Sequence, residues 1–182
     1  KSRCGHFWRW ALLLVCVLAL APASPAEALA GAGSIGVRPY FVNIIVGQST
    51  TVEIWVEEVE DYYGLEVKLR FDPARVSVPA GACAPLWDVF DEQHHLIVRN
   101  SADNQTGQVW YAISNLNPAG PFSGSGRICS LTFVGLANGP AQIEITFAQA
   151  ANRDGESLWP RVKPAGAVWV GPLRQVHLPM VG

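Results

Sequence analysis

The stretch Val52-Glu-Ile-Trp-Val-Glu-Glu-Val-Glu-Asp-Tyr-Tyr-Gly-Leu-Glu-Val-Lys-Leu-Arg-Phe71 decides the fold class of this chain. Its two ends alternate apolar and polar residues: positions 52, 54 and 56 are apolar, and so are positions 65, 67, 69 and 71. Successive side chains of a β-strand point to opposite faces, so each alternation predicts a strand with one buried face. The opposite positions carry charged groups, with Trp55 as the exception.

Similar runs follow this stretch toward the C-terminus, at residues 95–99, 109–114, 128–134, 143–147 and 167–170. They are rich in the β-branched and aromatic residues that favour strands. Turn-forming sequences separate them, such as Asp72-Pro73, Asn138-Gly139-Pro140 and Asp154-Gly155. No segment has a sustained helical period. About nine short strands over roughly 140 residues predict an all-β fold, a two-sheet antiparallel sandwich.

Composition is typical of one well-buried globular domain. The 182 residues include 13 Lys and Arg and 15 Asp and Glu, a formal net charge of −2. This balance lacks the basic footprint of a nucleic-acid-binding protein. Charged residues make up only 15% of the chain and hydrophobic residues 49%, which excludes disorder, a coiled coil and collagen.

Residues 1–30 have the features of a secretory signal peptide. Three basic residues precede an apolar run from Trp10 to Ala21, and small residues follow. We expect cleavage after Ala28-Leu-Ala30, with Ala21-Pro-Ala23 as the second choice. A membrane anchor is the alternative, but a spanning helix needs about 20 apolar residues and this run is shorter. We therefore expect a secreted or extracellular protein, with a sandwich over residues 31–170 and a tail over residues 171–182. The tail is open to three interpretations: a sorting element, a cell-surface attachment or an edge strand.

Two cysteines, Cys83 and Cys129, remain after removal of the leader. In an oxidising compartment they are candidates for one disulfide. A disulfide closing a loop of this length stabilises by about 4 kcal/mol in the chain-entropy model. Two buried free thiols are the equal alternative, because cysteine also serves as a small core residue.

Four blocks of the sequence, in order, resemble the cohesin family. The first runs from Val59 through the strand that ends in Phe-Asp-Pro73. The next two are Gly107-Gln-Val-Trp-Tyr-Ala-Ile-Ser114 and Gly124-Ser-Gly-Arg-Ile-Cys-Ser-Leu-Thr-Phe133. Asp154-Gly155 followed by Gly166-Ala-Val-Trp-Val170 closes the pattern. The resemblance covers about residues 35–170, nearly all of the chain that follows the predicted leader.

The resemblance implies a nine-stranded jelly-roll sandwich that acts as a non-catalytic receptor. Cohesins bind dockerin modules and thereby hold enzymes on extracellular, cellulosome-like scaffolds for polysaccharide breakdown. The dockerin-binding sheet generally contains strands three, five and six. Carried over by block and strand parity, its outward positions here are Glu66, Lys68, Arg70, His95, Ile97, Arg99, Trp110, Ala112 and Ser114.

Carbohydrate binding is the alternative function. Sugar-binding surfaces place flat aromatic rings against the apolar faces of the sugar. Trp55 and Trp169 both point outward by parity, and the resemblance implies that both lie in the sheet opposite the dockerin-binding sheet. A cell-surface adhesion or assembly role without dockerins is a third possibility, since one fold hosts many functions.

Enzymatic interpretations have little support in the sequence. The chain has no nucleophile elbow, phosphate loop or zinc-protease helix. His94 and His95 lie near Asp88, Asp91 and Glu92, but adjacent residues of a strand point to opposite faces and the spacing fits no metal site. We therefore expect no catalytic residues, no metal and no cofactor. A protein partner of the dockerin type is the leading expectation, with polysaccharide second.

Overall fold

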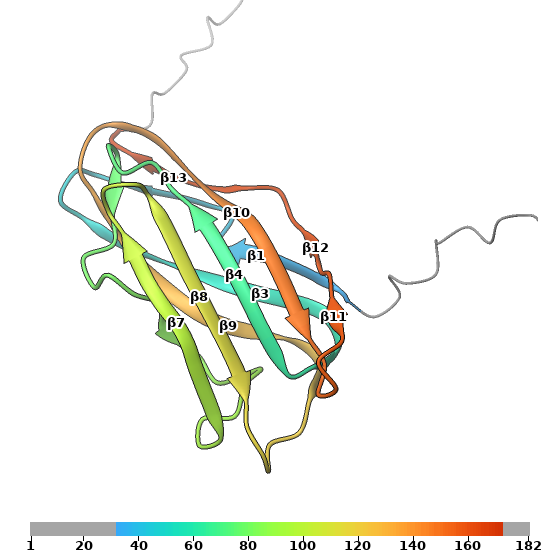
Figure 1. Ribbon diagram of the computed structural model, residues 1–182. Helices are drawn as coiled ribbons and strands as arrows, with labels where there is room; N and C mark the ends of the chain where they lie inside the picture. The colour runs from blue at the N-terminus through green and yellow to red at the C-terminus, as the bar shows by residue number, and fades with distance from the viewer. Residues whose placement is uncertain (1–31, 173–182) are drawn as a thin grey trace, which may run out of the picture.

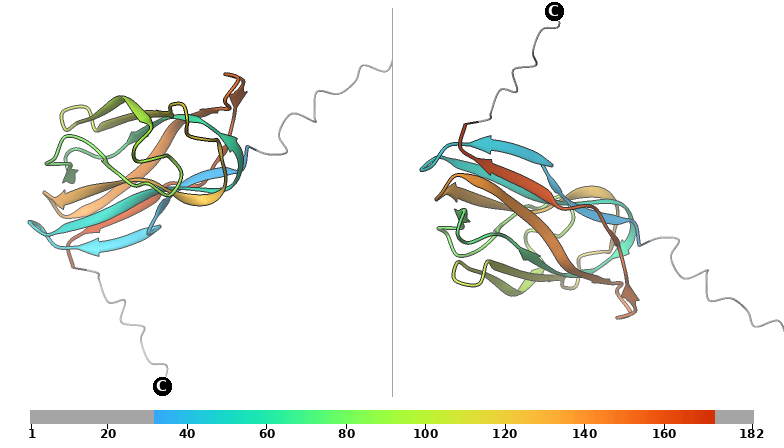
Figure 2. Two further views of the ribbon diagram at one scale, coloured as in Figure 1. Left: turned by 90° about the horizontal axis from the view of Figure 1, so that it is seen from below. Right: turned by 90° about the horizontal axis from the view of Figure 1, so that it is seen from above.

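The computed structural model describes residues 32–172, which form β-strands connected by turns and loops, with no helix in this range. The strands make two sheets that pack face to face (Figures 1 and 2). The all-β sandwich predicted from the alternation is confirmed. In this part of the chain no helix is long and apolar enough to cross a membrane.

The first sheet is built on β3 (Ser49–Tyr62), a long strand that includes the first half of the alternating stretch, residues 52–71. It pairs antiparallel with β1 (Ser34–Arg38) on one side and β9 (Phe122–Gly135) on the other. Three two-residue strands extend this sheet: β12 (Arg161–Val162) beside β1, and β5 (Val76–Ser77) and β6 (Ala84–Pro85) beside β9.

The second sheet lies in front of the first in Figure 1. The strand order starts at one edge with β2 and ends at the other edge with β7. In that order the strands are β2 (Phe41–Ile44), β13 (Gly166–Val170), β10 (Gly139–Ala151), β4 (Gly64–Arg70), β8 (Gln108–Asn115) and β7 (His95–Asp103), with β11 (Ser157–Leu158) pairing with β10.

The core fills the space between the two sheets as the sequence alternation predicts. Val52, Ile54 and Val56 of β3 are at most 2% exposed, and Val67 and Leu69 of β4 face them from the other sheet with similar burial. Burying each such side chain stabilises the fold by about 1.5–3 kcal/mol. The two alternating halves of the deciding stretch therefore supply one wall each of the same core.

Two of the sequence blocks meet at a turn. The backbone N–H of Phe71, at the end of β4, donates to the carbonyl oxygen of Gly107, 2.8 Å away, just before β8. Gly107 has a φ of +68°, and a Cβ there would lie 2.2 Å from the carbonyl oxygen of Phe71. Only glycine fits this position, since it has no Cβ and adopts positive φ freely.

One expectation about the strands needs correction. The pairing is not purely antiparallel, because β1 pairs parallel with β12 and β2 pairs parallel with β13. Within residues 32–172 the structure has thirteen strand segments, nine of them at least four residues long and four of them two residues long. The predicted signal peptide, residues 1–30, and residues 173–182 of the tail lie outside the described residues.

Candidate partner-binding face

The outward side chains of β4 and β8 form one continuous surface. In the antiparallel register Glu66 lies opposite Ala112 and Lys68 lies opposite Trp110. Residues opposite one another in a ladder point to the same face. The structure thus brings together the positions predicted on these strands: Glu66, Lys68, Arg70, Trp110, Ala112 and Ser114. We call the outward surface of β7, β8, β4 and β10 the outer face.

The positions predicted on β7 are wrong for two residues of three. A bulge between Ile97 and Arg99 shifts the register against β8. Ile97 lies opposite Ile113 on the core side, and His95 lies opposite the buried Asn115. The His95 ring packs at a tilt against Trp87, with ring centres 4.5 Å apart, instead of facing outward. Arg99 does reach the outer face, opposite Ala112, because the extra residue of a bulge reverses strand parity.

The same bulge exposes two apolar residues that the sequence analysis missed. Leu96 lies opposite Ser114 and is 52% exposed, and Val98, the bulged residue, is 66% exposed. Residues 96–98 are all apolar, so no alternation marks which of them face the core. The outer face therefore has an apolar edge along β7.

Strand β10 adds an aromatic group in a similar way. A bulge between Ile145 and Phe147 turns Phe147 outward, opposite Lys68 of β4. The ring of Phe147 meets the ring of Trp159 edge to face, with centres 6.1 Å apart. Trp159 is 52% exposed. These two aromatic residues were also missed as members of the face.

Cations and aromatic rings alternate across the outer face. The Lys68 Nζ lies 4.3 Å from the Trp110 ring centre and 4.9 Å from that of Phe147. On the other side of Trp110, the Arg99 guanidinium lies 5.1 Å from the ring centre. Such contacts are worth about 0.5–1 kcal/mol each at exposed sites. This row of alternating cations and rings holds Trp110 in place while leaving 40% of the surface of Trp110 exposed.

A shallow hollow of about 320 Å³ lies next to this row. Its floor is made by small residues on three neighbouring strands, because Gly64 of β4 lies opposite both Ser114 of β8 and Ala151 of β10. Ala112 also lines it, and is only 8% exposed because larger neighbours rise around it. Val98 forms part of the wall. The hollow is large enough for an apolar side chain of a partner.

The outward face of the first sheet is different, because its charged groups pair with one another. Glu57 binds both Arg38 and Lys163, and the hydrogen bond from Lys163 is the first cause of its lowered pKa. Asp88 accepts from Arg127 at 2.7 Å, and this contact lowers the pKa of Asp88. Most of the charge on this face is thus already neutralised within the chain.

Trp55 lies within that charged network. Its Nε1 donates to Glu53 at 2.9 Å, and the Arg38 guanidinium lies 4.5 Å from its ring centre. Trp169 lies elsewhere: β13 belongs to the second sheet, beside β10 and β2. The expectation that both tryptophans lie in the sheet opposite β4 and β8 is therefore wrong for Trp169. The two rings sit on different sheets and do not form one platform.

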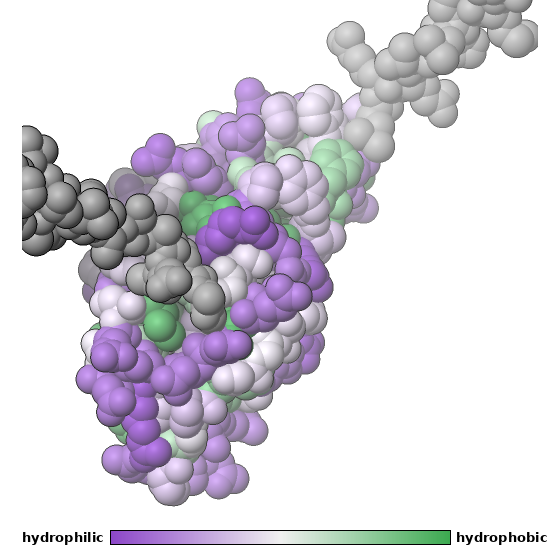
Figure 3. Space-filling model, turned by 90° about the vertical axis from the view of Figure 1, so that its right-hand side faces the viewer, coloured by the Kyte–Doolittle hydropathy of each residue, from purple (hydrophilic) through white to green (hydrophobic). Residues whose placement is uncertain are grey.

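The side view of the molecule in Figure 3 shows mostly polar side chains with small, scattered apolar patches. It faces the edge that carries β11 and β12 in Figure 1. Scattered apolar groups are ordinary for a protein surface, whereas a partner site groups them.

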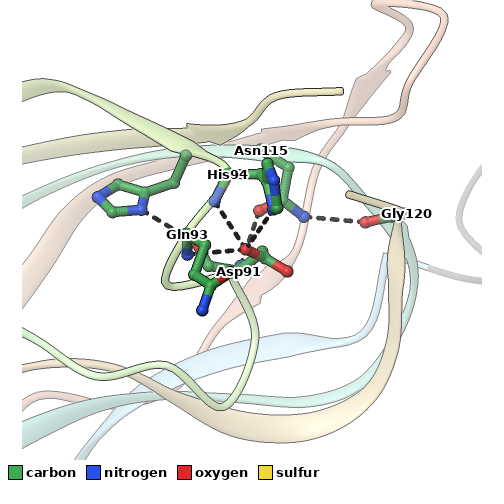
Figure 4. A network of polar contacts seen from close by, with 6 residues as sticks. Asp91, Gln93, His94, Asn115 and Gly120 are labelled. Atoms are coloured by element: carbon green, nitrogen blue, oxygen red, sulfur yellow. Dashed lines mark hydrogen bonds and ion pairs between the residues drawn. The ribbon is translucent and has the colours of Figure 1, made fainter. Parts of the chain in front are cut away.

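A polar network closes the end of the sandwich near β7 and β8 (Figure 4). The Asp91 carboxylate accepts the backbone N–H groups of Gln93 and His94, and the pKa of Asp91 is lowered by these bonds, with that from Gln93 first. Asn115 accepts from the Asp91 N–H and donates to the Gly120 carbonyl. The network anchors loops, and within residues 32–172 no three His, Cys, Asp or Glu side chains are grouped to hold a metal ion.

Cys83 and Cys129 are both free thiols in the core, 4% and 0% exposed. Burial, followed by a side-chain interaction with the neighbouring Cys83, raises the pKa of the Cys129 thiol. The structure thus places the two predicted cysteines together without a bond between them.

The strand order and the packing of the two sheets define a jelly-roll β-sandwich whose most distinctive surface is a mixed apolar and cationic face. A scan against models of known protein families gives no match, and a search of curated proteins gives none. Solved structures, by contrast, identify the fold: the chain has a cohesin-like fold.

Three cohesin structures illustrate the likeness. A type I cohesin–dockerin complex from Clostridium thermocellum superposes with a TM-score of 0.63 at 13% identity, covering 81% of this chain and 99% of that chain. A type II cohesin from the cellulosome of Acetivibrio cellulolyticus gives 0.61 at 12%, over 75% and 94%. The cohesin module of a family 33 glycoside hydrolase from Clostridium perfringens gives 0.60 at 10%, over 76% and 96%.

Proposed function

We propose that this chain is a secreted, non-catalytic receptor module that binds a dockerin-type module of another protein through its outer face. The cohesin-like fold supports the class of partner, because several of the similar structures are cohesins in complex with dockerins. Export is supported by the basic residues and apolar run of residues 1–30.

The observation that carries the proposal is the position of Trp110. It stands in the middle of the outer face, 40% exposed and flanked by two cations, beside the hollow of small residues. Tryptophan and arginine are the residues most enriched among the energetic centres of protein interfaces. Leu96 and Val98 add exposed apolar area at the edge of the face. A partner covering Trp110 would bury all three and fill the hollow.

The paired charges on the opposite sheet argue for the outer face as the binding side. Docking there would remove water from the ion pairs around Glu57 and Asp88 without supplying new partners. Desolvating paired charges is costly unless the interface replaces their hydrogen bonds. The outer face has fewer such pairs and more exposed apolar surface.

The test is capture of partners from the culture fluid of the source organism by the immobilised chain, followed by affinity measurement with the purified partner. We expect proteins that carry paired calcium-loop repeats, and we expect chelation of calcium to release them. Trp110→Ala should weaken the affinity at least about tenfold, or about 1.4 kcal/mol. Trp55→Ala is the matched control, a half-buried tryptophan on the other sheet, and should leave the affinity unchanged. Equal affinities for Trp110→Ala and the parent chain would refute the proposed face.

Polysaccharide binding is the second candidate, and the observation that favours it is the exposed Trp159 in edge contact with Phe147. With Trp110 these rings give the outer face three aromatic groups. Sedimentation with insoluble glycans tests this candidate. Binding that is lost in Trp159→Ala, with no capture of calcium-loop proteins, would assign the face to sugar instead.

A further inference from the structure

Residues 78–85 form a strap that connects the edges of the two sheets. Just after β7, at the edge of the second sheet, Asn104 binds the backbone of Val78 with two hydrogen bonds, 2.7 and 2.9 Å long. Asn100 binds the backbone of Cys83 in the same way, at 2.8 and 2.9 Å. At its other end the strap becomes β6, which pairs with β9 of the first sheet. The strap thus covers the free edge of β7 and joins it to β9.

The two buried cysteines lie at the junction of the strap with β9. Cys83 belongs to the strap and Cys129 to β9, where Pro85 and Cys129 are opposite each other in the ladder. Both side chains are buried in the same core cluster, where Cys83 is a neighbour of Cys129. Residues on the same face of neighbouring strands, opposite or diagonal, lie within reach of each other. Cys83 stands two residues before Pro85 and is therefore diagonal to Cys129, so a disulfide requires a small local approach of the strap to β9.

We propose that Cys83 and Cys129 form a disulfide when the chain folds in an oxidising compartment, and that this bond fastens the strap to β9. The oxidant is a disulfide-bearing compound, either a thiol–disulfide oxidoreductase or oxidised glutathione. One thiolate of the chain attacks that disulfide and forms a mixed disulfide, and the other then displaces the carrier thiol. Two thiols of the chain lose two protons and two electrons, and the carrier disulfide gains them as two thiols.

The surroundings of the cysteines determine when this exchange takes place. Thiolates are the attacking species, and burial in the core raises the pKa of the Cys129 thiol. The Tyr111 hydroxyl interacts with both thiols, but burial raises its own pKa and it has no hydrogen-bond partner among the described residues, so it stays protonated and provides no base. The bond therefore forms before the strap closes over β9. The folded, reduced protein should resist both alkylation and oxidation.

The consequence is a more firmly held β7. Without the bond, the strap is attached to β7 by amide hydrogen bonds and to β9 by a two-residue ladder. With the bond, opening of the strap requires opening of the core around β9. Amide exchange along residues 95–103 should then slow. The disulfide lies within one chain, so its formation does not depend on whether the outer face binds a dockerin.

The test uses the full chain with Cys4→Ser and Cys16→Ser, so that only the two core thiols are counted. The denatured, reduced chain is refolded at low concentration in a mixture of reduced and oxidised glutathione, and in parallel with excess reductant. Non-reducing peptide mapping should find the Cys83 and Cys129 peptides joined, with a mass lower by two hydrogen atoms. The midpoint of thermal unfolding should be higher by about 10 °C in the oxidised protein.

Cys83→Ala and Cys129→Ala in the same background are matched controls. In each of them the two refolding conditions should give the same midpoint, because one thiol cannot form the internal bond. The comparison of oxidised with reduced parent chain needs no core substitution, so it remains informative if a variant folds poorly. Two titratable thiols in the oxidatively refolded and then denatured chain would overturn the proposal, and so would joined peptides with an unchanged midpoint and unchanged exchange in β7.

Discussion

The Nζ atom of Lys68 lies 4.3 Å from the centre of the Trp110 ring. Lys68 is on β4 and Trp110 is directly opposite on β8, so the contact spans the middle of the outer face. Glu66 lies 3.1 Å from the same ammonium group and keeps it over the rings. The half-exposed Trp110 ring is thus held by charge as well as by packing.

This contact should be measurable as a coupling energy. We expect a double-mutant cycle with Lys68→Met and Trp110→Leu to give a coupling of about 0.5–1 kcal/mol in the free energy of unfolding. Urea titration of the four proteins provides the data. Glu60→Gln combined with Trp110→Leu is the control pair, because Glu60 is on the other sheet, and its coupling should be close to zero. A zero coupling for the first pair would show that the ammonium does not interact with the ring in solution.

The hollow beside Trp110 can be filled without straining the fold. A Cβ at Gly64 would meet its nearest neighbour, the Ser114 Oγ, at 3.5 Å, an ordinary contact distance. Gly64→Leu should therefore leave the unfolding free energy within about 1 kcal/mol while it occupies the space offered to the partner. We expect partner affinity, measured by calorimetry, to fall at least about tenfold.

Gly120→Leu is the control for that substitution, because an added Cβ there meets nothing within 4 Å and the residue lies in the loop after β8. Its partner affinity should equal that of the parent chain. If Gly64→Leu binds as tightly as the parent, the partner does not enter the hollow.

Regular alternation of polar and apolar residues predicted the strands. At the β-bulges it predicted the wrong orientation of the side chains. Where polar and apolar residues alternate, as in β3 and β4, both the strand and its buried face follow from the sequence. On β7 the run from Leu96 to Val98 is apolar at every position, so parity was extrapolated across a bulge and gave the wrong face for Ile97. Bulges depend on register with a neighbouring strand, and one sequence alone does not contain that register.

The sequence also did not determine, for every strand, to which of the two sheets it belongs. The blocks that resemble cohesins placed β4 and β8 correctly, because each block contains a whole strand and its turn. The sheet of β13 was also taken from the resemblance, and Trp169 was placed with Trp55 as a result. In the structure β13 lies between β10 and β2. Long-range pairing of this kind is fixed by packing, which strand alternation does not reveal.

The turn between the two sequence blocks gives a prediction about stability. Gly107→Ala would bring a Cβ to 2.2 Å from the Phe71 carbonyl oxygen in a backbone with φ of +68°. Backbone would have to shift, so we expect a loss of about 3 kcal/mol or more in the free energy of unfolding, measured by urea titration. Gly155→Ala is the control: its φ is +83° but no atom lies within 4 Å, so only the conformational term of about 1 kcal/mol applies. Similar losses in both variants would show that the close contact is relieved.

Acidification should weaken the charged network on the first sheet through Asp88. Its carboxylate accepts the Arg127 backbone N–H and two guanidinium N–H groups, and the side-chain bonds are the first cause of its lowered pKa. The unfolded chain, with an ordinary Asp pKa near 4, therefore takes up a proton at a higher pH than the folded chain. The stabilisation is complete above that value and is lost as the pH falls through the lower pKa of the folded state. Because both side chains are a third or more exposed, we expect less than about 1 kcal/mol.

Thermal unfolding from pH 7 to pH 3 measures this contribution. Asp88→Asn should be less stable than the parent at pH 7, and the difference should shrink as the pH falls, because the parent carboxylate is then protonated and the variant side chain never ionises. Glu60→Gln is the matched control, since the Glu60 carboxylate makes no hydrogen bond or ion pair within residues 32–172, and its difference from the parent should be small at pH 7. If the difference in stability between Asp88→Asn and the parent stays constant from pH 7 to pH 3, then Arg127 holds the loop that contains Asp88 through hydrogen-bond geometry alone. The charge of Asp88 would then make no contribution.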